Sequence, residues 1–333
     1  MRKVIIIKFF VLCLLSCKTA IKNSNAKVEI EEGVAIIEDK DEAITSPKVK
    51  KEKEKELASK ENCIAVADKN ILGFWVGYFR KATGDDYDEK TIYVDEGFHW
   101  SRENKINIAI DEVKDSLVIG HSVVAGNDRP FKGFLEKTKN GDCVFRVKEP
   151  GTHKYDGEFL FTIKDDKLIG NWLAYNDIDI RERKYTLEKK KFVYNPAVNL
   201  EESKRYIDWN KSKETKTIET YGDDEVEEWI NAEFASATDF IYTVNASSKL
   251  LTKKEVENLK KGDLVIIRNT IYARHGYSFK NRPLRVFFDA QTWYVPVYTN
   301  IKNEFTELEK KNIQLLLKYE KNALEYYDYF GRG

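Results

Sequence analysis

The side chain with the most defined chemistry is the thiol of Cys17, which follows an apolar stretch near the amino terminus. Residues 1–3 form a short basic start, and residues 4–15 are apolar except for Lys8. About a dozen apolar residues is too few for a transmembrane helix, which needs roughly 20. We therefore predict a signal peptide over residues 1–16, with a thiol directly after it that can act as a nucleophile.

The four residues ending at Cys17 resemble the lipobox of bacterial lipoproteins, in which the cysteine sulfur receives a diacylglyceryl group and cleavage makes that cysteine the first residue. Leu14, Leu15 and Ser16 complete the match. The resemblance implies membrane lipid as a partner, because several acyl chains anchor a protein that one chain would not. Lys18 stands where an aspartate would indicate inner-membrane retention, so the analogy favours the outer membrane of the cell envelope. An ordinary signal peptide with a chance cysteine is the alternative.

Two further cysteines, Cys63 and Cys143, remain once residues 1–16 are removed. In an oxidising compartment they could form a disulfide, or they could be two buried thiols, and the sequence leaves both open. The four histidines are far apart and lack metal-ligand spacing, and the chain has no phosphate loop, zinc-protease motif or nucleophile elbow. We expect no metal, no cofactor and no catalysis. The alternative is an enzyme acting on an envelope polymer, with carboxylates that the fold assembles between two domains.

The charge pattern separates a tether from the folded regions. Lysine plus arginine and aspartate plus glutamate both number 56, so no overall charge favours a nucleic acid as partner. Residues 17–62 contain no aromatic side chain and are rich in lysine and glutamate. Such a segment cannot bury a core, so we predict a solvated tether behind the lipid.

Residues 63–194 carry short apolar or alternating runs separated by Gly, Asn and Asp, the pattern of strands joined by tight turns. No helix of core length interrupts them, and closing such strands into a barrel removes their exposed edges. We predict an antiparallel β-barrel-like domain with strands at 71–79, 105–111, 116–124, 131–137, 144–149, 155–163, 167–175 and 183–189.

Gly73, Phe74 and Trp75 on the first predicted strand resemble the Gly-x-Trp of the lipocalin-like, calycin-type barrels. In that family an arginine from the last strand covers the tryptophan, a role that Arg181 or Arg183 would fill. The resemblance implies an apolar cup for a small ligand. The candidate ligand residues are Trp75, Trp172 and Arg183, which would otherwise be core.

A connecting segment, residues 195–247, follows the predicted barrel. In it, two aspartates precede Val226, Trp229, Ile230 and Phe234 at helical spacing. Acidic residues in a first turn followed by an apolar stripe indicate an amphipathic helix that joins two domains, with Trp229 as a packing residue.

Residues 248–333 show a second folded region that is mainly helical. Thr252 with Glu255 and Thr306 with Glu309 are capping-box patterns that each open a short helix. Between them, Asp263 is expected to cap a helix, and Gly276 is expected to end it.

The residues 272–276 read Tyr-Ala-Arg-His-Gly, which resembles the YARHG domain, named after these letters. The apolar run into Arg268 and the Trp-Tyr-x-Pro segment at Trp293 are similar to the same family. The family is described as an extracellular bacterial domain of unknown activity, so the resemblance supports the envelope address without supplying a function.

The side chains of this motif admit two interpretations. On a helix, Arg268, Tyr272 and His275 lie near one face, and the positive charges of Arg274 and His275 suit the helix carboxyl end, which favours a structural role. An arginine fork beside an aromatic ring also suits an anion or partner site, for which these four residues and Trp293 are the candidates.

The sequence thus predicts a multi-domain α+β protein: an antiparallel β-barrel-like domain followed by a small, mainly helical YARHG-like domain. We expect a lipid-anchored cell-envelope protein that serves as a non-catalytic binding or structural module. An envelope protein, a glycan or a small apolar ligand would suit it as partner.

Overall fold

The computed structural model describes residues 71–84, 90–95, 98–140, 142–221 and 225–323. The predicted signal peptide, Cys17, the tether and Cys63 lie outside these residues. Among the helices of the described part, none combines the length and the apolar character that a membrane span requires.

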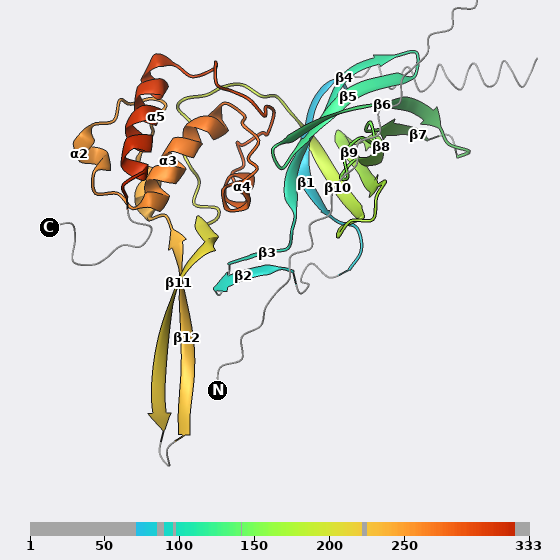
Figure 1. Cartoon of the computed structure of the whole chain (residues 1–333). Coiled ribbons are helices and arrows are strands. Elements are labelled where there is room, and N and C mark those ends of the chain that lie inside the picture. Colours follow the sequence, from blue (N-terminus) through green and yellow to red (C-terminus); the bar gives the residue numbers. More distant parts are fainter. Residues whose placement is uncertain (1–70, 85–89, 96–97, 141, 222–224, 324–333) are drawn as a thin grey trace, which may run out of the picture. The chain divides into compact units, whose positions relative to one another are not determined.

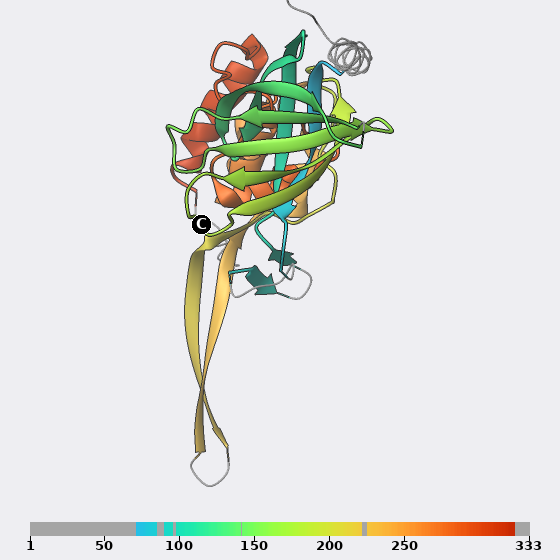
Figure 2. The ribbon, with the colours of Figure 1, turned by 90° about the vertical axis from the view of Figure 1, so that its right-hand side faces the viewer.

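Eight antiparallel strands close into a barrel, which confirms the predicted N-terminal fold (Figure 1). Each barrel strand pairs with the next barrel strand in the chain, and the first also pairs with the last, which closes the ring. Figure 2 shows the barrel strands after a rotation of 90°. The barrel strands are β1 (Gly73–Lys81), β4 (Asn104–Lys114), β5 (Leu117–Val124), β6 (Asn127–Lys137), β7 (Cys143–Lys148), β8 (Gly157–Lys164), β9 (Lys167–Ala174) and β10 (Glu182–Lys190).

Aromatic side chains fill the barrel interior. Phe79 lies edge-on to Trp172 with ring centroids 5.5 Å apart, and Phe159 meets Tyr185 at 6.0 Å. Tight turns deliver these residues to the interior: Asp165 and Asp166, between β8 and β9, have φ values of 51° and 57°. Successive left-handed residues match the twist of a two-residue hairpin, and aspartate tolerates that conformation.

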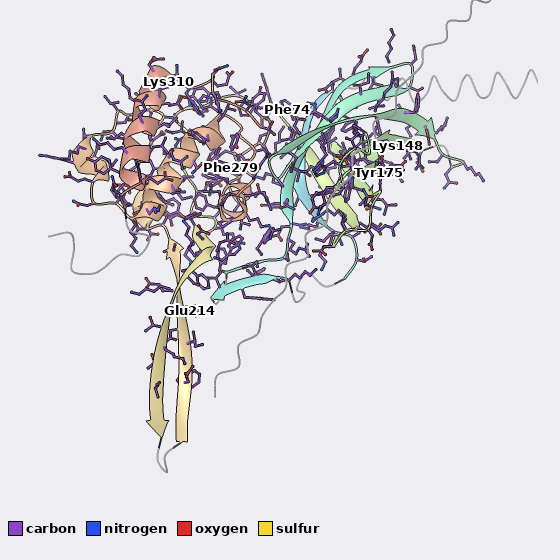
Figure 3. All side chains as sticks on the ribbon, in the orientation of Figure 1. Phe74, Lys148, Tyr175, Glu214, Phe279 and Lys310 are labelled. Carbon is purple, nitrogen blue, oxygen red and sulfur yellow. The ribbon has the colours of Figure 1, made fainter. Side chains whose placement is uncertain are left out.

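The carboxyl-terminal region contains a short 3₁₀ turn and four helices within the described residues: η2 (Asp239–Thr243), α2 (Lys253–Val256), α3 (Lys261–Arg274), α4 (Arg282–Asp289) and α5 (Glu307–Glu320). Their core includes Phe279, labelled in Figure 3, and Phe288, whose rings stack 4.6 Å apart. Both predicted capping boxes, at Thr252 and Thr306, are present.

The start of α3 differs from the prediction. Lys260 is the residue that precedes the helix, and Asp263 lies three residues further on, where its carboxylate accepts from the Lys260 backbone N–H at 3.2 Å. The Thr238 backbone N–H donates to the same carboxylate at 2.6 Å. Asp263 therefore holds two chain segments together at the helix start, a tertiary role that local sequence does not reveal.

The predicted amphipathic helix at 223–234 is wrong. The segment forms β12 (Glu225–Ser236), which pairs with β11 (Ile207–Tyr221) in a separate two-stranded sheet, where Figure 3 labels Glu214. Trp229 is 51% exposed, so the packing role predicted for it is also wrong. The cause is pairing with β11, which supplies a ladder and the cross-strand ion pair between Lys216 and Glu228.

A further two-stranded sheet that the sequence did not predict, β2 (Ile92–Asp95) with β3 (Phe98–Trp100), lies between β1 and β4 in the chain. Its Trp100 ring stacks on Trp209 of β11 with a centroid distance of 5.8 Å. This contact joins the insertion to the base of the β11–β12 ribbon.

The outer face of β4 contacts the helical region. The Lys105 Nζ donates to the carbonyls of Gln291 at 2.7 Å and Tyr294 at 3.1 Å, and the Asn107 amide donates to the Pro296 carbonyl at 3.0 Å. Seven consecutive residues of β4 are buried, because one face points into the barrel and the other is covered.

Candidate functional site

A cavity of about 830 Å³ lies at one end of the barrel. Strands that run toward this end contribute late residues, such as Val124 of β5 and Trp172 of β9, and strands that start there contribute early ones, such as Asn104 of β4 and Arg183 of β10. The helical region adds side chains from α4. The cavity is thus a barrel mouth completed by a second domain.

The inner wall of the cavity is aromatic, with one buried carboxylate. Glu149 accepts from the Gly157 backbone N–H at 2.7 Å, the Ser122 hydroxyl at 3.0 Å and the Trp172 indole at 3.3 Å. Burial raises the pKa of Glu149, and these hydrogen bonds oppose the rise. Both carboxylate oxygens are occupied, so Glu149 braces the wall that Trp172 and Phe159 form.

Arg183 projects into the cavity from the start of β10. Its Nη1 donates to the carbonyls of Phe79 at 2.9 Å and Arg102 at 3.2 Å, and its guanidinium lies 5.1 Å from the Phe79 ring centroid. Burial, together with the neighbouring charges of Arg102 and Arg285, lowers the pKa of Arg183 to about 10. Such a guanidinium is poorly solvated and is close to like charges.

Helix α4 brings two more arginines to the cavity. The Asn281 side chain accepts from the Leu284 backbone N–H at 3.1 Å and Pro283 stands in the first turn, which starts the helix here. Arg282 and Arg285, three residues apart on one face, then lie 5.9 and 5.8 Å from the Trp100 ring centroid. Arg285 is only 7% exposed.

The cavity uses only two of the three predicted barrel residues. Trp172 and Arg183 line it, whereas Trp75 lies in the packed core, where its indole donates to the Ile71 carbonyl at 2.8 Å. The prediction that Arg181 or Arg183 covers Trp75 is wrong: Lys189 lies over that ring, 5.6 Å from its centroid. Register explains the error, because Trp75 pairs with Lys189, six residues and about 20 Å along β10 from Arg183.

In the YARHG motif, Arg274 and His275 are held by internal contacts. Arg274 donates to the Val198 carbonyl at 2.9 Å and to the Ser247 hydroxyl at 3.1 Å, and burial lowers its pKa to about 10. The His275 Nε2 lies 2.9 Å from a Glu309 carboxylate oxygen, and its ring stacks on Tyr194 at 4.2 Å. These contacts tie the end of α3 to α5 and to the chain before the domain.

The other motif candidates, Arg268, Tyr272 and Trp293, are also packed. Arg268 makes a two-bond ion pair with Glu320 at 2.8 and 3.0 Å and lies over the Tyr272 ring. Trp293 packs edge-on to Tyr294, and its buried indole N–H has no hydrogen-bond partner among the described residues. The structure does not gather these side chains with Arg183 around one cavity.

The remaining predicted site residues give a partial result. Cys143, the first residue of β7, is disulfide-bonded. In the described part of the chain, no cluster of His, Cys, Asp and Glu has the makeup of a metal site. The residues that sequence reasoning missed include Asn104, Glu149 and Arg285. Only Arg285 had a local signal, the Asn-x-Pro start of α4.

Comparison with known families identifies residues 239–321 as a YARHG domain. This match begins at η2 and ends just after α5, so α4 and its two arginines belong to the domain. No curated protein and no solved structure shows significant similarity to the chain.

Proposed function

We propose that this chain is a non-catalytic, ligand-binding lipoprotein of the bacterial cell envelope, anchored through Cys17. The observation that carries the binding role is the cavity that the barrel mouth and the YARHG domain line together. The lipobox resemblance at Cys17 and the YARHG domain both support the address.

The bound molecule lies at the mouth and not in a deep cup as in the lipocalin-like barrels. Packed rings such as Phe145 and Phe161, which stack 4.8 Å apart and do not line the cavity, fill the barrel interior. Above them the lining is rich in charged and amide side chains, which fix the orientation of a polar ligand against an aromatic wall. This arrangement favours a glycan or another polar small molecule over an apolar one.

Native mass spectrometry of the full chain, extracted gently from membranes, tests the binding role. We expect a co-purifying small molecule that is lost in Val124→Phe, which narrows the mouth. The matched control is Leu173→Phe on the outer face of β9, where the side chain is 48% exposed. An empty wild-type protein that takes up nothing from an envelope extract would refute the binding role.

Lipid anchoring through Cys17 is tested by a cysteine variant and a matched control variant. Cys17→Ser is expected to abolish labelling by a fatty-acid probe and to leave uncleaved precursor. Cys13→Ser, in the segment that cleavage removes, is expected to change neither. Continued labelling of Cys17→Ser would show that the lipid is elsewhere.

An enzyme acting on an envelope polymer is the second candidate, because ionisable side chains converge between the domains and the pKa of Glu149 is raised. The occupied oxygens of Glu149 favour the binding role. Product formation from envelope glycans or peptides that stops in Glu149→Gln would reverse this ranking.

A further inference from the structure

The cavity contains a cluster of guanidinium groups that come from both domains. Arg102 and Arg183 belong to the barrel, and Arg282 and Arg285 belong to α4. Besides burial, the charges of Arg102 and Arg285 lower the pKa of Arg183. Burial and the charge of Arg282 likewise lower the pKa of Arg285, where the carboxylate of Asp289 on the same helix opposes them. Because like charges in a partly desolvated site destabilise one another, a negatively charged group bound in the cavity would stabilise the cluster.

The acidic side chains of the cavity do not meet this need. Six basic and three acidic residues line it. Of the acids, Asp179 already pairs with Lys90 at 3.1 Å and Arg102 at 3.3 Å, and Glu149 is held by the aromatic wall. The third, Asp177, is exposed to solvent. Within the described part of the chain, neither Arg183 nor Arg285 has a carboxylate at ion-pair distance.

Two residues that line the cavity each have a buried polar atom whose hydrogen-bonding capacity is unused within the described part of the chain. The Arg285 Nε and the Asn104 Oδ1 have no hydrogen-bond partner among the described residues, although Arg285 is 7% and Asn104 8% exposed. The Asn104 amide nitrogen donates to the Arg102 carbonyl at 3.3 Å, which fixes its oxygen as the open group. A free acceptor and a free donor that are both buried cost stability unless something bonds them.

Asn104 and Arg183 act on the same place. The Arg183 Nη1 donates to that same Arg102 carbonyl at 3.2 Å, so the Asn104 amide group and a guanidinium meet at one backbone oxygen. Arg102 has a φ of 68°, a left-handed conformation that is unusual for a side chain of this kind and that is typical of constrained binding sites. The pair presents a donor for an oxyanion next to an acceptor for a hydroxyl.

We infer that the cavity binds a small oxyanion that also carries hydroxyl groups, of the acidic-sugar class, with Arg183 and Arg285 on the oxyanion and Asn104 on a hydroxyl. This inference rests on the proposed binding function and names its ligand chemistry. A planar guanidinium matches a carboxylate or a phosphate with two parallel hydrogen bonds, which lysine cannot do. Because the arginines come from two domains, the ligand bridges them.

Isothermal titration of the full chain with glucuronate, glucose 6-phosphate and glucose tests the inference. Glucuronate carries a carboxylate and glucose 6-phosphate carries a phosphate, so the two ligands distinguish these oxyanions. Glucose is the uncharged control ligand. We expect at least one acid to bind about tenfold or more tighter than glucose, the value of one charge-assisted hydrogen bond. Added salt should weaken the binding of the acid and leave the binding of glucose unchanged.

The variants are Arg183→Lys, which keeps the charge and loses the fork, and Asn104→Asp, which places a negative charge beside the oxyanion. Both substitutions are expected to lower the affinity for the acidic ligand by about tenfold or more. The control is Arg146→Gln on β7, an exposed arginine that pairs with Glu136 and Glu158 outside the cavity. It removes one positive charge and should leave the affinity unchanged.

Each outcome separates this inference from the binding function. Equal binding of glucose and the acids, or equal weakening by Arg146→Gln, would overturn the oxyanion assignment and leave a ligand-binding cavity. Failure of both acids to bind to a protein that carries another molecule from the membrane would do the same. A protein that carries nothing and binds nothing would overturn both. If Arg183→Lys does not fold, as judged by its melting curve, Asn104→Asp decides.

Discussion

Replacing Glu309 by glutamine should destabilise the YARHG domain by an amount that depends on pH. Its carboxylate is fully buried and accepts from His275 at 2.9 Å, from the Tyr194 hydroxyl at 3.0 Å and from the Thr306 backbone N–H at 3.0 Å. Burial alone would raise the pKa of this carboxyl, but the hydrogen bonds from His275, Ser247 and Thr306 outweigh it and lower the pKa from 4.5 to about 2.

The lowered pKa converts into a free energy. A tenfold change in a proton equilibrium is worth about 1.4 kcal/mol, so the ionised Glu309 contributes about 3 kcal/mol to the stability at neutral pH. Because the pKa is lowered in the folded state, this contribution is present above about pH 4.5 and is lost as the pH falls toward 2. Glutamine keeps the shape and one acceptor but cannot carry the charge.

Urea unfolding of the full chain, followed by circular dichroism between pH 3 and 8, measures the effect. We expect Glu309→Gln to lower the free energy of unfolding by about 3 kcal/mol at pH 7 and by progressively less as the pH falls below 4.5. Glu307→Gln, on the exposed side of the same turn, should change little. A loss that is the same at pH 7 and pH 3 would refute the electrostatic reasoning.

Three further predictions concern stability. Burial raises the pKa of Asp289 to about 7, so the free energy of unfolding should fall by several kcal/mol as the pH rises from about 4 to 7, and Asp289→Asn should abolish that fall in urea titrations. Gly276→Ala should cost about 1–2 kcal/mol by the same assay, since φ is 71° and an added Cβ would lie 2.9 Å from the Phe192 ring. Trp229→Thr should leave the melting temperature unchanged, because half of that side chain is exposed, and a clear drop would show that the indole packs.

The barrel could be predicted from sequence because its signals are local. Each strand is a short run of apolar or alternating residues, and several turns contain residues that tolerate left-handed backbone, such as Asp165 and Asp166. Consecutive strands pair with one another, so the order along the chain is the order in the sheet. The same holds for the capping boxes at Thr252 and Thr306, whose partners are three residues away.

Features that depend on distant partners could not be predicted in this way. The apolar spacing of Val226, Trp229 and Ile230 fits a helix, but β11 pairs with this segment and makes it a strand. The family resemblance predicts Arg181 or Arg183 over Trp75, but the register places Arg183 beside Phe79, at the other end of β10 from the residue that pairs with Trp75. The cavity itself depends on side chains from strands and from α4, which no local pattern relates.

The YARHG motif and the proposed ligand site involve different residues of the same domain. Arg274 is hydrogen-bonded to Val198 and Ser247, and His275 is hydrogen-bonded to Glu309. These residues of the motif therefore hold the end of α3 in place. Arg285 instead lines the cavity at the barrel mouth, and its buried Nε has no hydrogen-bond partner among the described residues. The motif therefore describes a scaffold, and the ligand chemistry proposed for this chain depends on the barrel residues that α4 meets.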